Sequence, residues 1–246
     1  MEEVRHSRFK GAEWYSEDLS TYRTLVGGAG GIGSWLTYFL YKIGLHITIV
    51  DSDRVEEHNL GGQLLSGFDL GKYKTEAVVN MLKLTEGQYT LRRFYEKREW
   101  ITEETRLQYM YMFSAFDNMT ARKILFEKWV IYNFVWSEEG VYTPISTLNA
   151  PIFIDGRLEM EQIQIFAITT SEQIHKYRDE HLFDEADVEE AACTMKQTSH
   201  TAAMIGAKMA SIFTNHLSNI NSGSKNRIVP FYYEEFTPLL LNTVEI

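Results

Sequence analysis

A glycine-rich turn between two apolar segments is the part of this sequence best suited to chemistry. It reads Gly28-Ala-Gly30-Gly-Ile-Gly33, and a β-branched run further on ends at Asp51. Gly28 permits a tight turn, Gly30 lets backbone N–H groups approach phosphates, and Gly33 lets a helix pack close to a strand. The start of that helix offers unsatisfied N–H groups to an anion, and Asp51 can accept hydrogen bonds from ribose hydroxyls. The pattern predicts a nucleotide-binding unit of strand, turn, helix and strand.

Hydrophobic periodicity predicts the elements that position these residues. Besides the strands on either side of the turn, apolar or alternating runs predict strands at residues 89–95, 109–116, 151–155, 161–168 and 227–236. Helical periodicity predicts helices after the glycine turn and at residues 77–82, 119–130 and 201–217. This alternation predicts an α/β fold: a Rossmann-like, mostly parallel sheet with helices on both faces and a mixed or antiparallel far edge.

Three details of this assignment depend on single residues or segments. Asp117 and Asn118 both precede a predicted helix, and Asp117 is the favoured N-cap. Gly156 and Arg157 predict a polar turn between two strands. The segment 171–190 is highly charged, and we expect it to leave the sheet as an exposed excursion.

Length and composition narrow the class of protein. The 246 residues are expected to form one elaborated domain, residues 1–246, with an N-terminal arm at residues 1–20. The net charge of −10 argues against nucleic-acid binding. The sequence has no signal-peptide core and no apolar run of the roughly 18 residues that span a bilayer. The single cysteine, Cys193, excludes an intramolecular disulfide and any CxxC zinc site. We therefore expect a cytoplasmic protein without zinc or membrane contact.

Three further motifs follow the glycine turn in order. They are DSDRVEEHNLGGQ from Asp51, DLGKYKTEA from Asp69 and SAFDNMTAR from Ser114. Together with the turn they resemble the ThiF/MoeB family, the prokaryotic relatives of ubiquitin-activating enzymes, and the resemblance extends from Arg5 to about Leu217. It implies ATP and Mg²⁺ as cofactors, a homodimer, and adenylation of the C-terminal glycine of a small ubiquitin-like or sulfur-carrier protein. Thioester or sulfur transfer follows in many members.

The resemblance implies a role for individual residues. Asp51 matches the residue that holds the ribose, and Lys74 matches the lysine that meets the triphosphate, with Lys72 close by. Asp117 matches the aspartate that supports Mg²⁺ and the reacting centre, and Arg122 continues its motif. The implied nucleotide-binding residues are Gly28, Gly30, Gly31, Gly33, Asp51, Asp53, Asn59, Gln63, Lys74 and Asn118.

Two implied catalytic residues lie outside these motifs. Arg8 ends an R-H-S-R segment that resembles one whose arginine reaches across a homodimer into the partner's ATP site. Cys193 precedes the helix at 201–217, where relatives place a cysteine for acyl or sulfur transfer, and nearby basic residues would favour its thiolate. A buried, unreactive cysteine fits the sequence equally well. The charged segment 171–192 matches a crossover loop over a partner's tail, or is a solvated surface.

One departure from the family pattern concerns a cation. Relatives carry an arginine beside the triphosphate at the position of Gly62, and the sequence offers only Arg54 nearby as a substitute. Loss of that cation gives an alternative function, a catalytically degenerate scaffold that holds nucleotide or a partner protein.

The sequence also bears on an alternative enzyme class and on the placement of the chain within the family. The glycine turn and Asp51 also fit an NAD-dependent oxidoreductase, but that activity explains neither Lys74 nor the Asp117 motif. Because the chain is compact and lacks the zinc cysteines, it looks more like the ThiF-type proteins of mobile elements, such as the PRTRC plasmid systems, than like thiamin or molybdopterin enzymes.

Overall fold

A computed structural model describes residues 7–86, 94–97, 102, 107–146, 150–159, 162–183, 198–236 and 241–245. The strands of its main sheet are β1 (Arg23–Gly27), β2 (His46–Val50), β3 (Phe94–Lys97), β4 (Tyr111–Ser114), β7 (Ile152–Glu159), β8 (Gln162–Ile168), β9 (Tyr232–Phe236) and β10 (Leu241–Glu245). Within the described residues their order is β10-β9-β8-β7-β4-β1-β2-β3. Strands β3, β2, β1, β4 and β7 run parallel, and β8, β9 and β10 continue antiparallel. This confirms the predicted mostly parallel α/β sheet with an antiparallel far edge.

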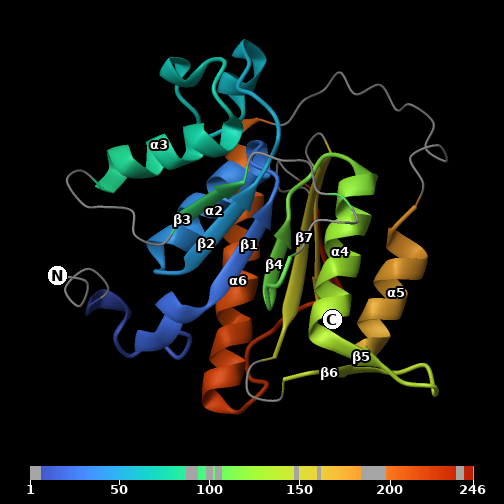
Figure 1. The fold of residues 1–246 in the computed structure, drawn as a ribbon. Helices are drawn as coiled ribbons and strands as arrows, with labels where there is room; N and C mark the ends of the chain where they lie inside the picture. Colours follow the sequence, from blue (N-terminus) through green and yellow to red (C-terminus); the bar gives the residue numbers. More distant parts are fainter. Residues whose placement is uncertain are drawn as a thin grey trace.

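Helices cover both faces of the sheet (Figure 1). They are α2 (Gly31–Lys42), α3 (Lys74–Glu86), α4 (Met119–Asn133), α5 (Ser171–His181) and α6 (Ser199–Ser222). Helices α2 and α6 pack on one face together with α3, and α4 and α5 pack on the other. Short 3-10 turns are η1 (Ser7–Phe9), η2 (Glu17–Thr21), η3 (Glu57–Gly61) and η4 (Gly67–Asp69), and a small hairpin, β5 (Phe134–Trp136) and β6 (Tyr142–Pro144), follows α4.

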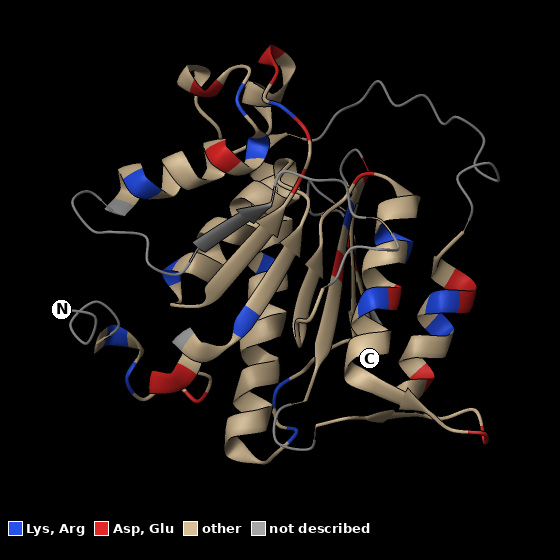
Figure 2. Ribbon diagram, viewed as in Figure 1, with Lys and Arg blue, Asp and Glu red and all other residues tan. Residues whose placement is uncertain are grey.

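Consecutive residues of the central strands point to opposite faces, so the sheet has a core on each side. On β1, Val26 packs in the core under α2 and α6, and Leu25 packs in the core under α4. On β4, Phe113 and Met112 are divided in the same way. Strands buried on both faces carry continuous rather than alternating apolar runs. Charged residues lie instead on outer elements such as α4 and α5, where the ribbon of Figure 2 carries blue and red segments.

Helix α6 is longer than the predicted helix at 201–217 and lies close against α2. Its C-terminus is set by Gly223, which has a left-handed backbone with φ 62°, the conformation that glycine adopts most easily. A Cβ on Gly206 would lie 3.0 Å from the backbone nitrogen of Leu36 in α2. The absence of that Cβ therefore allows the two helices to approach closely.

The predicted polar turn at Gly156 and Arg157 is wrong, because both residues lie inside β7 and pair with β8. A Cβ on Gly156 would lie 2.5 Å from the sulfur of Met209, so the glycine makes room for a side chain of α6. Arg157 forms an ion pair with the buried carboxylate of Asp155. Packing and charge pairing thus keep a glycine and a charged residue within a strand.

The predicted excursion at 171–190 is also wrong over its first half, since residues 171–181 form helix α5. Thr170 caps this helix, its hydroxyl accepting a hydrogen bond from the backbone N–H of Gln173. Ile174 and Tyr177, three positions apart, are fully buried against the sheet. The charges occupy the other side of the helix, and residues 184–197 lie outside the described part of the chain.

The N-terminal segment from η1 to η2 packs on the domain. Leu19 is only 2% exposed and belongs to the core under α2 and α6. The side chain of Asn221, at the end of α6, donates a hydrogen bond to the backbone oxygen of Glu13, and Arg227 pairs with the Glu13 carboxylate. Among the described helices, none has the length and apolar character needed to cross a membrane.

Candidate nucleotide site

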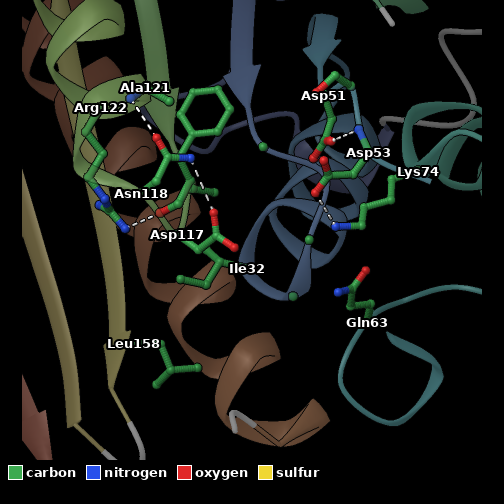
Figure 3. Close-up of a pocket in the computed structure, with 16 residues that line it drawn as sticks. Ile32, Asp51, Asp53, Gln63, Lys74, Asp117, Asn118, Ala121, Arg122 and Leu158 are labelled. Carbon is green, nitrogen blue, oxygen red and sulfur yellow. Dashed lines mark hydrogen bonds and ion pairs between the residues drawn. The ribbon is translucent and has the colours of Figure 1, made fainter. Parts of the chain in front are cut away.

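A cavity opens at the carboxyl ends of the parallel strands β1 and β4 (Figure 3). The strand order reverses between these neighbours, because β2 and β3 follow on one side of β1 whereas β4 and β7 lie on the other. This switch point is where open α/β sheets usually bind ligands. The cavity has a volume of about 360 Å³, within the roughly 300–1,000 Å³ typical of ligand sites. Its lining residues are Gly28, Gly30, Gly31, Ile32, Asp51, Ser52, Asp53, Gln63, Lys74, Ala115, Phe116, Asp117, Asn118, Ala121, Arg122 and Leu158.

The glycine turn forms one wall of the cavity, and each of its positions requires or favours glycine for a different reason. Gly28 has φ +93°, and a Cβ there would lie 2.6 Å from the Ala115 carbonyl oxygen. A Cβ on Gly33 would lie 1.9 Å from the Gly28 carbonyl oxygen. Gly30 is the N-cap of α2 and offers no side-chain cap; the nearest atom to a Cβ there would be Gln63 Nε2, at 3.9 Å. The turn therefore presents the backbone of the α2 N-terminus to the cavity, an arrangement that favours anions.

Three charged residues occupy the wall formed by β2 and the start of α3. Asp51 accepts hydrogen bonds from the Ala29 N–H at 2.6 Å and the Asp53 N–H at 2.7 Å. Burial raises the pKa of the Asp51 carboxyl, although these two N–H groups oppose the shift. Lys74 Nζ lies 2.8 Å from the Asp53 carboxylate, and this lysine side chain is only 12% exposed. The carboxylate of Asp51 thus braces the glycine turn, and Lys74 is held beside it.

The segment after β2 contributes Gln63 but not Asn59. Gln63 lines the cavity, and its buried Oε1 has no hydrogen-bond partner among the described residues. Asn59 caps η3 by accepting a hydrogen bond from the Glu56 N–H and is absent from the lining. Arg54 donates to the Gly71 carbonyl oxygen and stacks on Tyr73, so it does not supply a cation to the cavity in this structure.

Two further positions on this segment complete the wall. Gly62, the position at which the family resemblance implies an arginine, is buried at the end of η3. Lys72 pairs with Asp69 and is not a lining residue. Lys74 is thus the lysine that the structure places at the cavity.

The opposite wall is the turn between β4 and α4. Asp117 is exposed at the cavity, and Asn118 Nδ2 approaches its carboxylate at 3.4 Å. Asn118, not the favoured Asp117, caps α4: its Oδ1 accepts a hydrogen bond from the Ala121 N–H at 2.8 Å. Asn118 has extended backbone directly before the first helical residue, which gives its oxygen the right reach. The cap therefore leaves the Asp117 carboxylate available to a ligand.

Sequence reasoning noted Arg122 as part of the Asp117 motif but missed the partners that it has behind this wall. Arg122 lines the cavity and is ion-paired with Asp155, which is fully buried. Asp155 also binds Arg157 and accepts a hydrogen bond from the Tyr177 hydroxyl. The sequence signal for this cluster is an aspartate and an arginine on either side of a glycine after an apolar run, a pattern that also predicts a turn.

A comparison with protein-family profiles decides the family. The ThiF family profile matches residues 5–244. The chain belongs to the ThiF family. This ThiF chain also resembles one curated protein, the "Adenylyltransferase and sulfurtransferase UBA4" of Yarrowia lipolytica, at 41% identity over 66 residues. That match spans 26% of this chain and only 17% of the length of the relative.

Solved structures agree with the ThiF fold. Escherichia coli MccB with ATP superposes with a TM-score of 0.67 at 15% identity, covering 98% of this chain and 70% of MccB. MccB with selenomethionyl MccA gives 0.69 at 14% identity, covering 98% of this chain and 70% of MccB. PaaA gives 0.66 at 16% identity, covering 99% of this chain and 82% of PaaA. At sequence identities this low, the structural similarity shows a shared fold and nothing finer.

Of the two catalytic residues implied outside the main motifs, only Arg8 lies in the described part of the chain, and it is not at the cavity. Arg8 is exposed on η1, near the start of β1, whereas the cavity lies at the carboxyl ends of the strands (Figure 1). Cys193 lies outside the described residues. Within the described part of the chain, no three His, Cys, Asp or Glu side chains cluster as a metal site. The functional groups that one copy of this ThiF chain brings together at the cavity are therefore those of the glycine turn, the Asp51–Lys74 wall and the Asp117 wall.

Proposed function

We propose that this ThiF-family chain binds ATP with Mg²⁺ and adenylates the C-terminal carboxylate of a small ubiquitin-like or sulfur-carrier protein. The observation that carries the proposal is a single cavity in which the uncapped N-terminus of α2 and Lys74 face the Asp117 carboxylate (Figure 3). Support also comes from MccB, a ThiF-like fold whose structures include complexes with ATP and with MccA.

The residues at the glycine wall fit a nucleotide. The N–H groups at the start of α2 suit phosphate oxygens, and Asp51 suits ribose hydroxyls. Gln63 Oε1, buried and without a partner among the described residues, can accept a hydrogen bond from the ligand. Lys74 would exchange its contact with Asp53 for a phosphate. These groups would hold the nucleotide and stabilise the charge that develops on its phosphates.

The wall that carries Asp117 fits the metal and the acceptor carboxylate. Mg²⁺ prefers oxygen ligands, and Asp117 presents an exposed carboxylate at the cavity. When bound, the metal supplies positive charge to phosphates as they separate. In the reaction, a carboxylate oxygen bonds to the α-phosphorus, the bond to the bridging oxygen breaks, and pyrophosphate leaves. Asp117 would hold the metal beside the phosphates, and Lys74 and the N–H groups at the start of α2 would orient the phosphates during that step.

With Gly62, the single chain lacks the arginine that the family resemblance implies beside the triphosphate. Lys74 and Arg122 are the cations of the cavity lining, and both are paired with carboxylates in this structure. We propose that Arg8 of a second copy completes the site in a homodimer, and that Cys193 forms a thioester with the activated partner. The alternative favoured by Gly62 is a degenerate scaffold that binds ATP without turnover. Kinship with the PRTRC proteins stays a prediction, since the relatives above are of other kinds.

Calorimetric titration with ATP and Mg²⁺, with NAD in parallel, tests the proposal first. We expect ATP to bind, NAD not to bind, and Asp117→Asn to weaken the Mg²⁺-dependent part of ATP binding. Asp179→Asn, which removes an exposed carboxylate on α5, is the matched control and should behave like the wild type. Binding of NAD alone, or of neither nucleotide, would contradict the proposal.

Pyrophosphate exchange then separates the enzyme from the scaffold. The assay would use ATP, Mg²⁺ and a panel of small proteins and peptides that end in glycine. Exchange that depends on one member of the panel would support adenylation. ATP binding without exchange for any member would favour the degenerate scaffold.

A further inference from the structure

Four side chains form a largely buried polar cluster behind the Asp117 wall: Arg122, Asp155, Arg157 and Tyr177. Arg122 NH1 pairs with Asp155 Oδ1, and Arg157 Nε lies 2.7 Å from Asp155 Oδ2. The Tyr177 hydroxyl donates to the same Oδ2 at 2.9 Å. Asp155 is 0% exposed and Arg122 is 6% exposed. One carboxylate therefore anchors two guanidinium groups inside the protein.

The charge of this cluster requires an explanation beyond stability. Burial would raise the pKa of Asp155, but Arg122 and Arg157 outweigh burial and hold its pKa below the ordinary value. The carboxylate is thus ionised, and two arginines with one aspartate leave a net charge of about +1. Buried ion pairs seldom stabilise a fold more than apolar side chains of the same volume would. The cluster is better explained by what its arginine holds in place.

Arg122 reaches from the first turn of α4 to two backbone carbonyl groups. Its NH2 donates to the Phe116 oxygen, and its NH1 lies 3.2 Å from the Gly156 oxygen. Phe116 directly precedes Asp117, and Phe116, Asp117 and Asn118 all line the cavity. The guanidinium therefore ties the turn at 116–118 to strand β7.

We propose that Arg122, anchored by Asp155, is a positioning residue that fixes the turn at 116–118 and with it the Asp117 carboxylate. Its catalytic meaning rests on the proposed adenylation, but the positioning itself does not. The glycine wall has its own supports, the Ala29–Asp51 hydrogen bond and the Asp53–Lys74 ion pair. Loss of the Arg122 contacts should consequently affect the Asp117 wall, including the Mg²⁺-dependent part of ATP binding, and spare the binding of nucleotide without Mg²⁺.

Arg122→Lys tests the proposal because it keeps the charge and removes the planar fork that reaches several acceptors. Hydrogen exchange of the amides of residues 116–122 should become at least about tenfold faster, while exchange at residues 28–34 stays unchanged. In an active preparation kcat should fall up to ~10²-fold, as small misplacements can cause, while the Kd for ATP measured without Mg²⁺ changes less than about twofold. Unchanged exchange at 116–122 would overturn the proposal.

Arg178→Lys is the matched control. Arg178 holds the Glu127 carboxylate of α4 through Nε and NH2, at 2.7 and 2.9 Å, and does not contact the turn. This variant should leave exchange at 116–122 and kcat at wild-type values. Faster exchange at 116–122 in this variant as well would show a general loosening of α4 and would contradict a specific role for Arg122.

The triple variant Arg122→Met, Asp155→Leu, Arg157→Met guards against simple misfolding. Apolar replacement of a whole buried ion cluster usually preserves the fold. If the cluster only stabilises the protein, this variant should restore slow exchange at 116–122. We expect exchange there to stay fast. Because exchange requires no substrate, it decides the positioning role even if pyrophosphate exchange fails and the proposed function is wrong.

Discussion

At the scale of single residues, the glycines of the turn are needed for different physical reasons, although they belong to one motif. Gly28 and Gly33 are required by nearby backbone atoms, whereas Gly30 faces open space in the cavity. The first two positions determine whether the turn can form, and the third determines what can approach it. This difference can be tested without any partner protein.

Gly33→Ala and Gly30→Ala should have opposite consequences. The new Cβ at 33 would lie 1.9 Å from a backbone oxygen, so the free energy of unfolding should fall by at least about 1–3 kcal/mol, as overpacking typically costs. The new Cβ at 30 meets nothing closer than 3.9 Å and should weaken ATP binding with little change in stability. Urea denaturation and calorimetry measure the two effects. Equal destabilisation by both variants would contradict this assignment.

Residues that belong to short motifs could be predicted to gather at one site, and those that act across strands could not. Gly28, Gly30, Gly31, Asp51 and Lys74 lie at the cavity because each follows a strand or lies at the start of a helix at the same edge of the sheet, whereas Gly33 is not a lining residue. Asn59 does not line it, since its side chain caps a local turn. The Arg122–Asp155 pair joins α4 to β7, and such pairing depends on sheet order, which no local pattern reveals. The roles of the lining residues stay predictions.

At the scale of elements, α6 is anchored near its C-terminal end by a buried histidine. His216 is 6% exposed, and its Nε2 lies 2.9 Å from the Ala150 carbonyl oxygen, just before β7. Burial lowers the pKa of His216, although the hydrogen bond to Ala150 opposes the shift. The folded protein therefore holds this imidazole neutral while it donates to the carbonyl.

Acidification should consequently weaken the protein through His216. Because its pKa is lower in the folded state than in the unfolded chain, unfolding takes up a proton as the pH falls through about 6.5. The slope for one such group is at most about 1.4 kcal/mol per pH unit. His216→Gln should be less stable near neutral pH but lose less stability between about pH 7.5 and about pH 5. Identical slopes for the two proteins in urea denaturation would contradict this role.

The central elements were predictable from sequence, and the errors lay where tertiary contacts override local patterns. The continuous apolar runs of β1, β2 and β4 and the periodicity of α6 gave strong local signals. Gly156 in β7 and the charges on α5 gave misleading ones, because a neighbouring helix and a buried face decide those segments. The β5–β6 hairpin and β10 were missed because they are short or lie at the end of the sheet.

At the scale of the whole molecule, the segment before β1 helps to close the core. Leu19 is buried beneath the sheet, and Glu13 is held by Asn221 and Arg227 near the C-terminal end of α6. These contacts join segments far apart in the sequence. The described part of the predicted arm is therefore integrated with the domain.

Leu19→Ala should destabilise the entire domain. Truncation of a buried leucine costs about 2–5 kcal/mol through lost burial and the cavity that remains. The midpoint of urea denaturation should fall for probes on both faces of the sheet, with an unchanged slope if unfolding stays two-state. Leu84→Ala, at an exposed leucine of α3, is the control and should change little. A transition confined to the N-terminal segment would show that this segment opens independently.

The pairing of β1 with β4 has a consequence for synthesis on the ribosome. The glycine turn is braced by Ala115, whose N–H donates to Gly27 at 2.8 Å and whose carbonyl faces Gly28. Translation proceeds at about 5–20 residues per second, so the turn waits on the order of ten seconds for its neighbour to be made. Until then β1 can pair with β2, but its other edge, which pairs with β4 in the folded protein, has no partner strand and is open to chaperones or aggregation. The most recognisable motif of the chain is thus translated early and completed late.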